Sequence, residues 1–518
     1  MIAQLILYGY PLVVLMMFQR LSRHEALIWS ILCGYLFLPE RIGIDLPLLP
    51  QLNKVLIPSF TAGLMCLLLP DADGLKKNHR RSTRATALKD ASDNTASPRR
   101  GSAMANICLL VIFLVPIGVF ATNTEAVVYG PRRIEGVRPY DIFSMILNMG
   151  VVLLPFLLAR RYLTTSAARI ALLRALVFGG LIYSLLILIE VRLSPQLNKW
   201  IYGYYAHSFA QHIRAGGFRP MVFLEHGLFV GIFVAMTSLA AATLWRMKRA
   251  TNYSDPIPSH DRSPSRRRSI PAKKPTYLFY AAYLFIILFL SKTLGAFMIA
   301  FALLPIALFF AARTKLLVAA SIAGMVLLYP ALRTTDVFPM DQLIENLTAL
   351  NAERASSFIF RVNNEDALLE RAREKPTFGW GGWSRSNIFD PETGKNLSVT
   401  DGVWVIIFGQ QGWFGYLAQF GLLTLPMIAL ALRRREVGIV ESGLCLILAA
   451  NLVDLLPNSA LTPLTWMIAG TVLAFYENPV QARAPATAKK RARAGPVQTS
   501  PVARRTPVVK AKGRGRQA

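Results

Sequence analysis

The sequence is poor in charge and in the residues that build covalent or metal frameworks. Of its 518 residues only 17% are charged, whereas 53% are hydrophobic, and there are just 4 cysteines and 6 histidines. An average soluble domain is roughly one quarter charged. All the cysteines lie inside apolar runs without metal-ligand spacing, which argues against a disulfide framework and a zinc site. The composition excludes an ordinary soluble enzyme and a disordered chain, and favours a membrane protein.

Positive charge is abundant, but it is concentrated in three polar stretches. Residues 71–104, 246–275 and 477–518 contain 28 basic and 7 acidic residues, and so carry +21 of the net charge of +28. They lack the stacking aromatic residues that accompany basic residues in nucleic-acid-binding surfaces. We interpret them as disordered cytoplasmic linkers and a tail that follow the positive-inside rule and face anionic membrane lipid. No nucleic acid partner is expected.

Apolar runs recur along the rest of the chain and predict an all-α, polytopic membrane bundle of about 12–13 transmembrane helices. A bilayer core of about 30 Å needs about 20 apolar residues. Three glycines, Gly409, Gly412 and Gly415, are expected to break the longest run into a re-entrant piece and a full helix. The thirteen expected spans are 2–19, 25–39, 55–70, 105–122, 141–159, 169–190, 220–245, 276–291, 295–312, 314–330, 403–432, 437–456 and 461–476.

The domain organisation follows from these runs and from the alternation of sides. The segment 331–400 falls opposite the basic stretches and is nearly neutral, with 8 basic and 10 acidic residues. Its helical spacing of apolar residues predicts a small helical cap over the outer mouth of the bundle. The expected parts are transmembrane helices 1–70, linker 71–104, helices 105–245 with outer loop 191–219, linker 246–275, helices 276–330, large loop 331–400, helices 401–476 and tail 477–518.

Residues of functional type gather first in the segment 207–226. It contains Arg214 and Arg219 and ends in Glu225-His226, which we expect a turn or two inside the following span. Arginine suits phosphate because its planar fork binds two oxygens and stays charged. Headgroup anchoring is the alternative for the arginines. An ionisable residue inside a span is a functional candidate, although a snorkelling pair or a satisfied buried histidine is the alternative here.

The second concentration lies in the segment 354–404. Arg361 and Glu365 are four residues apart on an expected helix and would share a face, where an ordinary ion pair is the alternative to a ligand-binding role. The run Phe378-Gly-Trp-Gly-Gly-Trp383 offers flat rings for stacking on sugars or for a belt at the membrane interface. Asp401 lies at the start of the next span. It could serve there as the N-cap of the helix or as a general base.

The order of these motifs resembles the O-antigen ligase and O-antigen polymerase superfamily. The resemblance rests first on Arg-x-Gly-Gly-Phe-x-Pro at 214–220, which precedes a span. It rests next on Arg361 in a long outer loop ahead of Ala-Arg-Glu-Lys-Pro-Thr-Phe-Gly-Trp-Gly at 372–381. A polar residue then heads a helix with Gly-x-x-Gly-Trp-x-Gly at 409–415. The motifs span about 200–430 of the chain.

This resemblance implies an inverting, metal-independent glycosyltransferase of the bacterial inner membrane, with periplasmic catalytic loops and no cofactor. Such enzymes take a glycan from undecaprenyl diphosphate and pass it to an acceptor hydroxyl. The acceptor is lipid A core in ligases and another lipid-linked glycan repeat in polymerases. Through the resemblance, Arg214 and Arg361 match the family arginines that hold the diphosphate.

Asp401 stands where the ligases place a histidine, and no histidine follows His260. The difference favours a polymerase or exopolysaccharide enzyme over a ligase and makes Asp401 the candidate general base. We expect Arg219 to assist in holding the diphosphate. Glu365 and His226 are secondary substrate-binding candidates.

Three other functions remain open from the sequence. A transporter or flippase of a lipid-linked glycan would carry ionisable residues deep in several spans. A glycosyltransferase that uses polyprenyl-phosphate sugars usually has paired acids in its first outer loop, where this chain has only Glu40 and Asp45. A structural membrane protein is the third. Apart from Glu190, Glu225, Lys292, Glu441 and Asp454, most of which lie near the ends of helices, the expected spans are nearly uncharged.

Overall fold

The computed structural model describes residues 2–45, 50–69, 102–214, 216–253, 277–334, 352–433 and 437–478, with single positions 342, 345 and 349. All of them lie in one compact unit, Met1–Asn478. Most of the three basic stretches, and most of the helix expected at 341–354, lie outside the described residues.

Helices dominate the described residues, and the strands are confined to three short antiparallel hairpins. The helices are α1 (Ile2–Arg20), α2 (Arg23–Phe37), α3 (Leu56–Leu68), α6 (Ser102–Thr122), α7 (Pro139–Tyr162), α8 (Ser166–Leu193), α9 (Leu197–Tyr202), α10 (Gly227–Tyr253), α11 (Tyr277–Leu290), α12 (Leu294–Phe309), α13 (Ala312–Thr334), α15 (Ala352–Arg373), α16 (Val403–Leu432), α17 (Ile439–Asp454) and α18 (Pro463–Glu477). The hairpins pair β1 (Gly43–Ile44) with β2 (Leu52–Asn53), β3 (Val127–Tyr129) with β4 (Arg132–Ile134), and β5 (Ile213–Arg214) with β6 (Gly217–Phe218).

The protein is an all-α polytopic membrane protein, as the apolar runs predicted. Each of the thirteen expected ranges coincides with a helix among the described residues. Seven of these helices are long and apolar enough to cross a bilayer, and three shorter ones are also apolar. Most boundaries differ from the expectation by a few residues, and the two ends of one helix differ most. Helix α10 begins at Gly227 and not at 220, because residues 219–226 form a loop, and it continues to Tyr253 into the expected linker.

Helix α10 is the centre of the bundle. Its apolar window is 89% buried, whereas those of α1, α6 and α7 are about one third buried or less. Small residues let its neighbours approach closely: a Cβ on Gly180 of α8 or Gly443 of α17 would overlap Thr237 or Thr243 of α10. Close approach of this kind maximises van der Waals contact between helices in lipid, where the hydrophobic effect does not drive their association.

Helix α16 is broken at one of the three glycines. Gly412 has φ 61° and ψ −162°, a conformation that only glycine adopts readily. The segment 376–381 packs into the break: Trp380 N–H donates to Gly409 O at 2.8 Å, and Trp413 N–H donates to Pro376 O at 2.7 Å. The break thus anchors the chain that connects α15 to α16.

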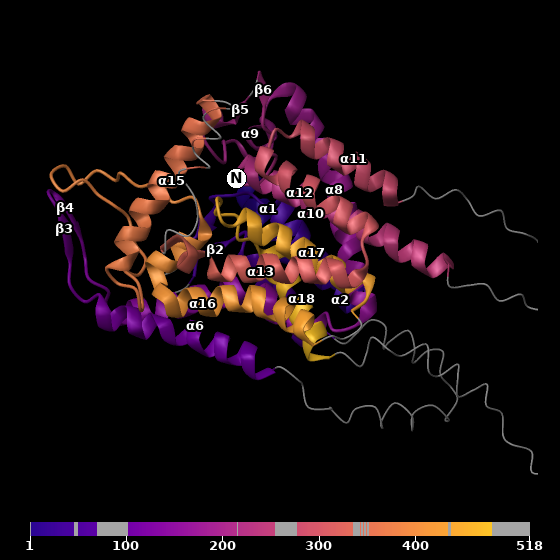
Figure 1. Ribbon diagram of the computed structural model, residues 1–518, viewed down its shortest axis with the longest axis horizontal. Coiled ribbons are helices and arrows are strands. Elements are labelled where there is room, and N and C mark those ends of the chain that lie inside the picture. Colours follow the sequence, from indigo (N-terminus) through magenta and orange to yellow (C-terminus); the bar gives the residue numbers. More distant parts are fainter. Residues whose placement is uncertain are drawn as a thin grey trace, which may run out of the picture. The chain divides into compact units, whose positions relative to one another are not determined.

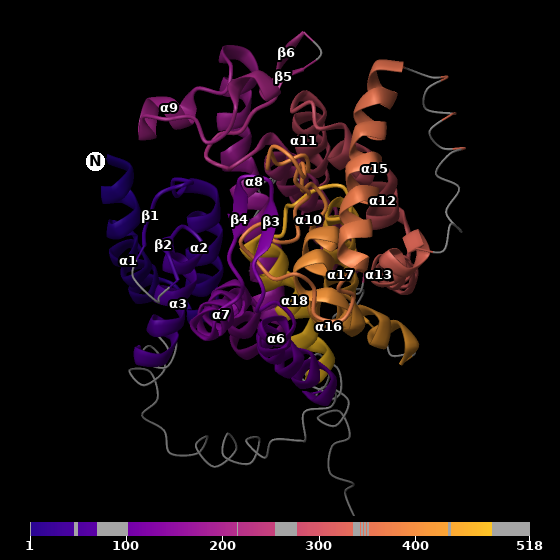
Figure 2. The same cartoon turned by 90° about the vertical axis from the view of Figure 1, so that its left-hand side faces the viewer.

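The two ends of the bundle carry different structures. At one end, which we call the cap end, lie the β3–β4 hairpin, the β5–β6 hairpin, α9 and α15 (Figure 1). Figure 2 looks at this end, with α15 on one side and β5–β6 at the edge. We call the opposite end, which includes Arg160, Arg169, Glu441 and Glu477, the linker end. The charges at the two ends are arranged differently, as described below.

Candidate functional site

A loop at the cap end, residues 203–226, is fixed in place by a buried acid. Glu190, at the end of α8, is only 1% exposed. Its carboxylate accepts hydrogen bonds from the backbone N–H groups of Leu197 at 3.0 Å, Met221 at 2.8 Å and Val222 at 2.7 Å. Hydrogen bonds to a charged acceptor are about twice as strong as neutral ones. Glu190, which the sequence marked only as a charged exception, therefore positions the segment that leads to His226.

Three histidines converge in this loop. The ring centroids of His207, His212 and His226 lie 4.7–5.8 Å from one another. His226 Nδ1 accepts from the backbone N–H of Leu228 at 3.1 Å, so the neutral ring carries its proton on Nε2. Among the described residues no group of three His, Cys, Asp or Glu side chains has the geometry of a metal site.

The environment of His226 disfavours a charged imidazole. Burial lowers its pKa to about 3, and the neighbouring histidines, Arg219 and Arg361 contribute to the shift. Two arginines from segments far apart in the chain therefore lie close enough to His226 for their charges to act on it. A neutral ring with Nε2–H can donate one hydrogen bond to an anion or a hydroxyl.

Arg219 lies where the loop meets the turn between α11 and α12. Its Nη2 donates to the carbonyl oxygen of Lys292 at 3.5 Å. A Cβ at position 227 would overlap the Arg219 side chain, so Gly227 provides the space that this arginine occupies. Lys292 Nζ approaches the backbone of Gly217 closely. Positive charge thus gathers around the β5–β6 hairpin.

Arg361 reaches the same end of the bundle from α15. Its Nε lies 3.5 Å from Asp401 Oδ2, and the two side chains are 38% and 40% exposed. Its Nη1 donates to Asn458 Oδ1 at 3.4 Å, in the connection between α17 and α18. Asp401 is not the N-cap that the sequence suggested, since Gly402 takes that place without a side-chain cap.

The structure brings some of the predicted site residues to the same end of the bundle, but not all of them can be placed. Arg219, His226, Arg361 and Asp401 all lie at the cap end. Arg214 pairs through its backbone with Gly217, and its side chain lies outside the described residues. The expectation that Glu225 and His226 lie inside a span is wrong, because both precede α10.

Glu365 does not pair with Arg361, and its carboxylate is part of another contact. Its Oε1 lies 3.3 Å from Arg333 Nε and accepts from the Tyr329 hydroxyl at 3.1 Å. Burial raises the pKa of Glu365, and the Arg333 charge opposes that rise. Arg333 also pairs with Asp366 at 2.6 Å. Glu365 thus joins α15 to α13. This structural contact explains the presence of Glu365 without a role in ligand binding.

The two tryptophans of the aromatic run differ in burial: Trp380 is buried and Trp383 is exposed. Trp380 is 8% exposed, with the Arg371 guanidinium 3.4 Å and Lys375 Nζ 4.5 Å from its ring centroid. Its Nε1 donates to Arg371 O at 2.8 Å. Trp383 is 53% exposed. Only Trp383 therefore presents a free face of the kind that stacks on a sugar or lies in an interface.

The residues that sequence analysis passed over lie beneath Arg361. Asn458 Nδ2 donates to Asp454 Oδ1 at 2.9 Å, and Asp454, the last residue of α17, is 2% exposed. The only signal in the sequence was an acid inside an apolar run. That Asp454 meets Asn458 and Arg361 depends on the packing of α15 against the α17–α18 connection.

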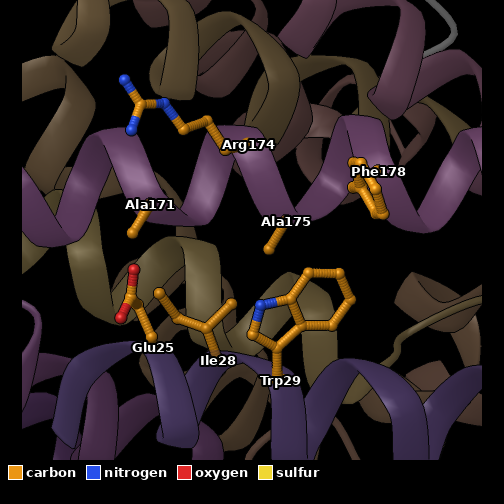
Figure 3. A pocket seen from close by; sticks show the side chains of 7 residues that line it. All are labelled: Glu25, Ile28, Trp29, Ala171, Arg174, Ala175 and Phe178. Atoms are coloured by element: carbon orange, nitrogen blue, oxygen red, sulfur yellow. The ribbon is translucent and has the colours of Figure 1, made fainter. Parts of the chain in front are cut away.

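A cavity of about 290 Å³ lies elsewhere, between α2 and α8. In Figure 3, Glu25, Ile28 and Trp29 rise from one helix toward Ala171 and Ala175 on the other, while the Arg174 guanidinium stands apart. None of its lining residues belongs to the cap-end cluster described above. The cavity therefore adds nothing to the candidate site.

No protein-family model matches the chain, and no curated protein matches it. The site is therefore interpreted from its own geometry.

Proposed function

We propose that the protein is a membrane glycosyltransferase that takes a glycan from a polyprenyl diphosphate carrier, such as undecaprenyl diphosphate, and passes it to an acceptor hydroxyl. The observation that carries this proposal is the presence of two arginines at the cap end of the bundle, Arg219 against Gly227 and Arg361 beside Asp401, near the buried His226. Loss of a diphosphate builds negative charge on the leaving group. Arginines fixed beside it stabilise that charge in the transition state.

The exposure of Arg361 suits this role. Arg361 is 38% exposed, and its contacts to other described residues are 3.4–3.5 Å long, so its planar fork is accessible to a diphosphate. His226 adds one donor without adding charge. Diphosphate binding of this kind uses the protein's own cations, as the resemblance to the O-antigen enzymes implies.

We further propose that the cap end faces the periplasm of a bacterial inner membrane. The stretches 71–104 and 246–275 join helices at the linker end, and basic segments remain cytoplasmic. A carrier with a long lipid tail enters sideways from the bilayer, and helix ends beneath α15 are reached by that route. Polymer growth and transfer to lipid A are both compatible with this placement.

A transporter or flippase of a lipid-linked glycan is the alternative. It is favoured by ionisable residues buried within the helices, such as Glu190 and Arg169. Both are engaged by the protein itself: Glu190 accepts three backbone hydrogen bonds, and Arg169 Nε lies 2.9 Å from Glu441 Oε1. Charges engaged in this way stabilise the packing and leave less to line a path. We therefore favour the transferase.

A deletion strain tests the proposal. Its surface polysaccharide is compared on gels with that of the complemented strain, and lipid-linked intermediates are measured with their leaflet. We expect loss of the polymer and accumulation of carrier-linked glycan on the outer leaflet. Single repeats capped on lipid A indicate a polymerase, and carrier-linked polymer with bare lipid A core indicates a ligase. Full-length polymer on lipid A contradicts the proposal, and accumulation on the cytoplasmic leaflet indicates the transporter.

A further inference from the structure

The cavity between α2 and α8 exists because the residues of α8 beside it are small. Farther along, the two helices pack closely, since a Cβ on Gly179 would come within 3.2 Å of Leu32 Cδ2. Nearer the first turns of both helices, Ala171 and Ala175 face α2, and the cavity of about 290 Å³ lies beside them (Figure 3). Close-packed protein interiors leave few voids larger than a water molecule. A space of this size at the surface of a helix pair can hold part of a ligand.

The cavity opens on a face of α8 that is turned toward the bilayer. Phe178, which lines the cavity, is 61% exposed, and the apolar side chains of Ile182, Leu185 and Ile189 are exposed as well. Their spacing of three and four residues places them on one side of the helix. In a membrane protein an exposed apolar stripe of this kind contacts lipid tails, which are as apolar as leucine. A molecule that enters the cavity from this side therefore comes from the bilayer.

Arg174 marks the level of the lipid headgroups on α8. Arg174 and Arg192 are eighteen residues apart, which is about 27 Å along a helix and close to the thickness of a bilayer core. Glu190 is the only charged residue between them. The Arg174 side chain runs back along α8 toward Ala171 in Figure 3, as a long basic side chain does when it reaches for headgroups. The cavity thus lies where headgroups and tails of one leaflet meet.

Glu25 and Arg174 present opposite charges at this level. Arg174 is exposed, and no described residue pairs with its guanidinium. The Glu25 carboxylate accepts from the Ser22 hydroxyl at 2.6 Å through Oε2, whereas its Oε1 has no partner among the described residues. Figure 3 shows the guanidinium and the carboxylate on opposite sides of Ala171. A ligand that carries an anion and a cation a short distance apart complements both charges.

Trp29 adds a neutral donor between the charged groups and the tails. Its indole lines the cavity, and in Figure 3 its ring nitrogen faces the gap between the two helices. An indole N–H only donates hydrogen bonds, and tryptophan is enriched where a bilayer changes from apolar to polar. The ester and phosphate oxygens of a phospholipid are suitable acceptors for this group.

We propose that the cavity binds the headgroup of phosphatidylethanolamine from the leaflet at the linker end. The phosphate pairs with Arg174, whose planar fork offers two donors to two oxygens. The ammonium group donates to Glu25, and the tails follow the stripe that begins at Phe178. A choline headgroup carries its positive charge without an N–H to donate, so it satisfies Arg174 and leaves Glu25 unpaired. Arg174 accounts for binding of the phosphate, and Glu25 for selection of the amine.

Native mass spectrometry of the purified full-length protein tests the site. Phosphatidylethanolamine and phosphatidylcholine with identical tails are titrated separately. Both lipids are zwitterionic, so general attraction to the basic stretches of the chain is the same for each. We expect the wild type to bind phosphatidylethanolamine at least about tenfold more tightly, the lower range for hydrogen bonds to a charged group. Equal affinity for the two lipids overturns the proposal.

Two variants separate the roles of the charges. Glu25→Gln removes the charge but keeps an oxygen that accepts from Ser22, so the start of α2 stays capped. Its affinity for phosphatidylethanolamine should fall to that for phosphatidylcholine. Arg174→Gln should weaken binding of both lipids by a similar factor. A preference that survives in Glu25→Gln, or affinities unchanged in Arg174→Gln, overturns the proposal.

A filled cavity and a matched control complete the test. Ala171→Leu occupies the space without changing either charge, and we expect it to abolish the preference for phosphatidylethanolamine. Arg192→Gln is the control, because Arg192 is an exposed arginine near the other end of the same helix. It should leave both affinities unchanged, and a loss as large as that in Arg174→Gln overturns the assignment. Glycosyl transfer is not measured in any of these experiments, so their outcome is independent of the proposed function.

Discussion

The ion pairs at the two ends of the helical bundle differ in distance and in exposure. At the linker end Arg169 and Glu441 are 2.9 Å apart and 1% and 9% exposed, and Arg160 lies 2.7 Å from Glu477. At the cap end Arg361 and Asp401 are 3.5 Å apart and more than one third exposed. Short buried pairs fix helices relative to one another. Long exposed pairs can be opened by a ligand at little cost.

The contrast is not absolute. The cap end also holds a short, largely buried pair, Lys54 with Glu40 at 2.6 Å, and the linker end also buries Lys315, whose Nζ has no hydrogen-bond partner among the described residues. The contrast nevertheless distinguishes Arg169, which stabilises helix packing in a buried pair, from Arg361, which lies in an exposed pair. The following variants are ordered by the size of the effect that the comparison predicts.

Breaking the buried pair should cause the largest loss of stability. Arg169→Ala leaves Glu441 buried without its cation, and we expect a loss of about 3–5 kcal/mol in the free energy of unfolding. Thermal unfolding in detergent measures it. The control is Arg133→Ala, because Arg133 and Glu135 are 65% and 56% exposed and their pair should contribute less than about 1 kcal/mol. Equal stability of the two variants would show that burial does not distinguish the pairs.

Removing Arg361 at the cap end should reduce activity and leave stability nearly unchanged. Arg361→Ala is expected to reduce polymer formation about 10²–10³-fold, equivalent to about 2.7–4 kcal/mol of transition-state stabilisation. Its melting temperature and membrane amount should stay near those of the wild type, since the side chain is 38% exposed. Polymer assays alongside thermal unfolding check both parts. A variant that unfolds while the remaining folded protein stays active would assign Arg361 to stability.

The break in α16 offers a smaller, structural test. Gly412→Ala places a Cβ against the carbonyl of Thr377 at a backbone conformation with φ 61°. We expect a loss of about 1–3 kcal/mol in stability and looser attachment of segment 376–381. Gly150→Ala is the matched control, because nothing lies within 4 Å of its Cβ inside α7. That variant should be neutral or more stable by up to about 1 kcal/mol. Similar losses of stability in both variants would show that the conformation of Gly412 is not specially important to the fold.

The smallest effect concerns pH and His226. Its pKa is lowered to about 3 in the folded protein, mainly by burial, whereas an unfolded histidine titrates near about 6.5. The unfolded state therefore binds the proton first. Stability is fully present above about pH 6.5 and falls as the pH drops toward 3. Between pH 7 and pH 5 we expect this group to contribute about 1–2 kcal/mol of loss. His226→Gln should flatten the pH dependence of unfolding by that amount, and an unchanged slope would refute the buried, neutral ring.

Prediction from the sequence succeeded where the signal was local. Apolar runs placed the helices, and the glycine-rich run 409–415 predicted a break, which the structure has at Gly412. The chemistry of arginine suggested Arg219, the resemblance suggested Arg361, and the diphosphate-binding role of both stays a prediction. The N-terminal boundary of α10 was misplaced because residues 220–224 are apolar but are held in a loop by hydrogen bonds to Glu190 and Tyr183.

Pairings between distant segments were beyond the sequence. Arg361 and Glu365 share a helix, yet each finds its partner on another element, Asp401 and Arg333 respectively. The flat faces of Trp380 are occupied by cations from its own neighbourhood. Asp454 stood out only as a charge in an apolar run, and its link to Arg361 passes through an amide that no spacing rule identifies.

The sequence by itself determined that this chain crosses a membrane many times as helices, because lipid leaves backbone groups no other partners and apolar runs of spanning length occur throughout. Only the tertiary structure decided which charges are locked in buried pairs and which remain open beside His226. Such contacts join residues hundreds of positions apart, and their geometry is set by the packing of small side chains between helices.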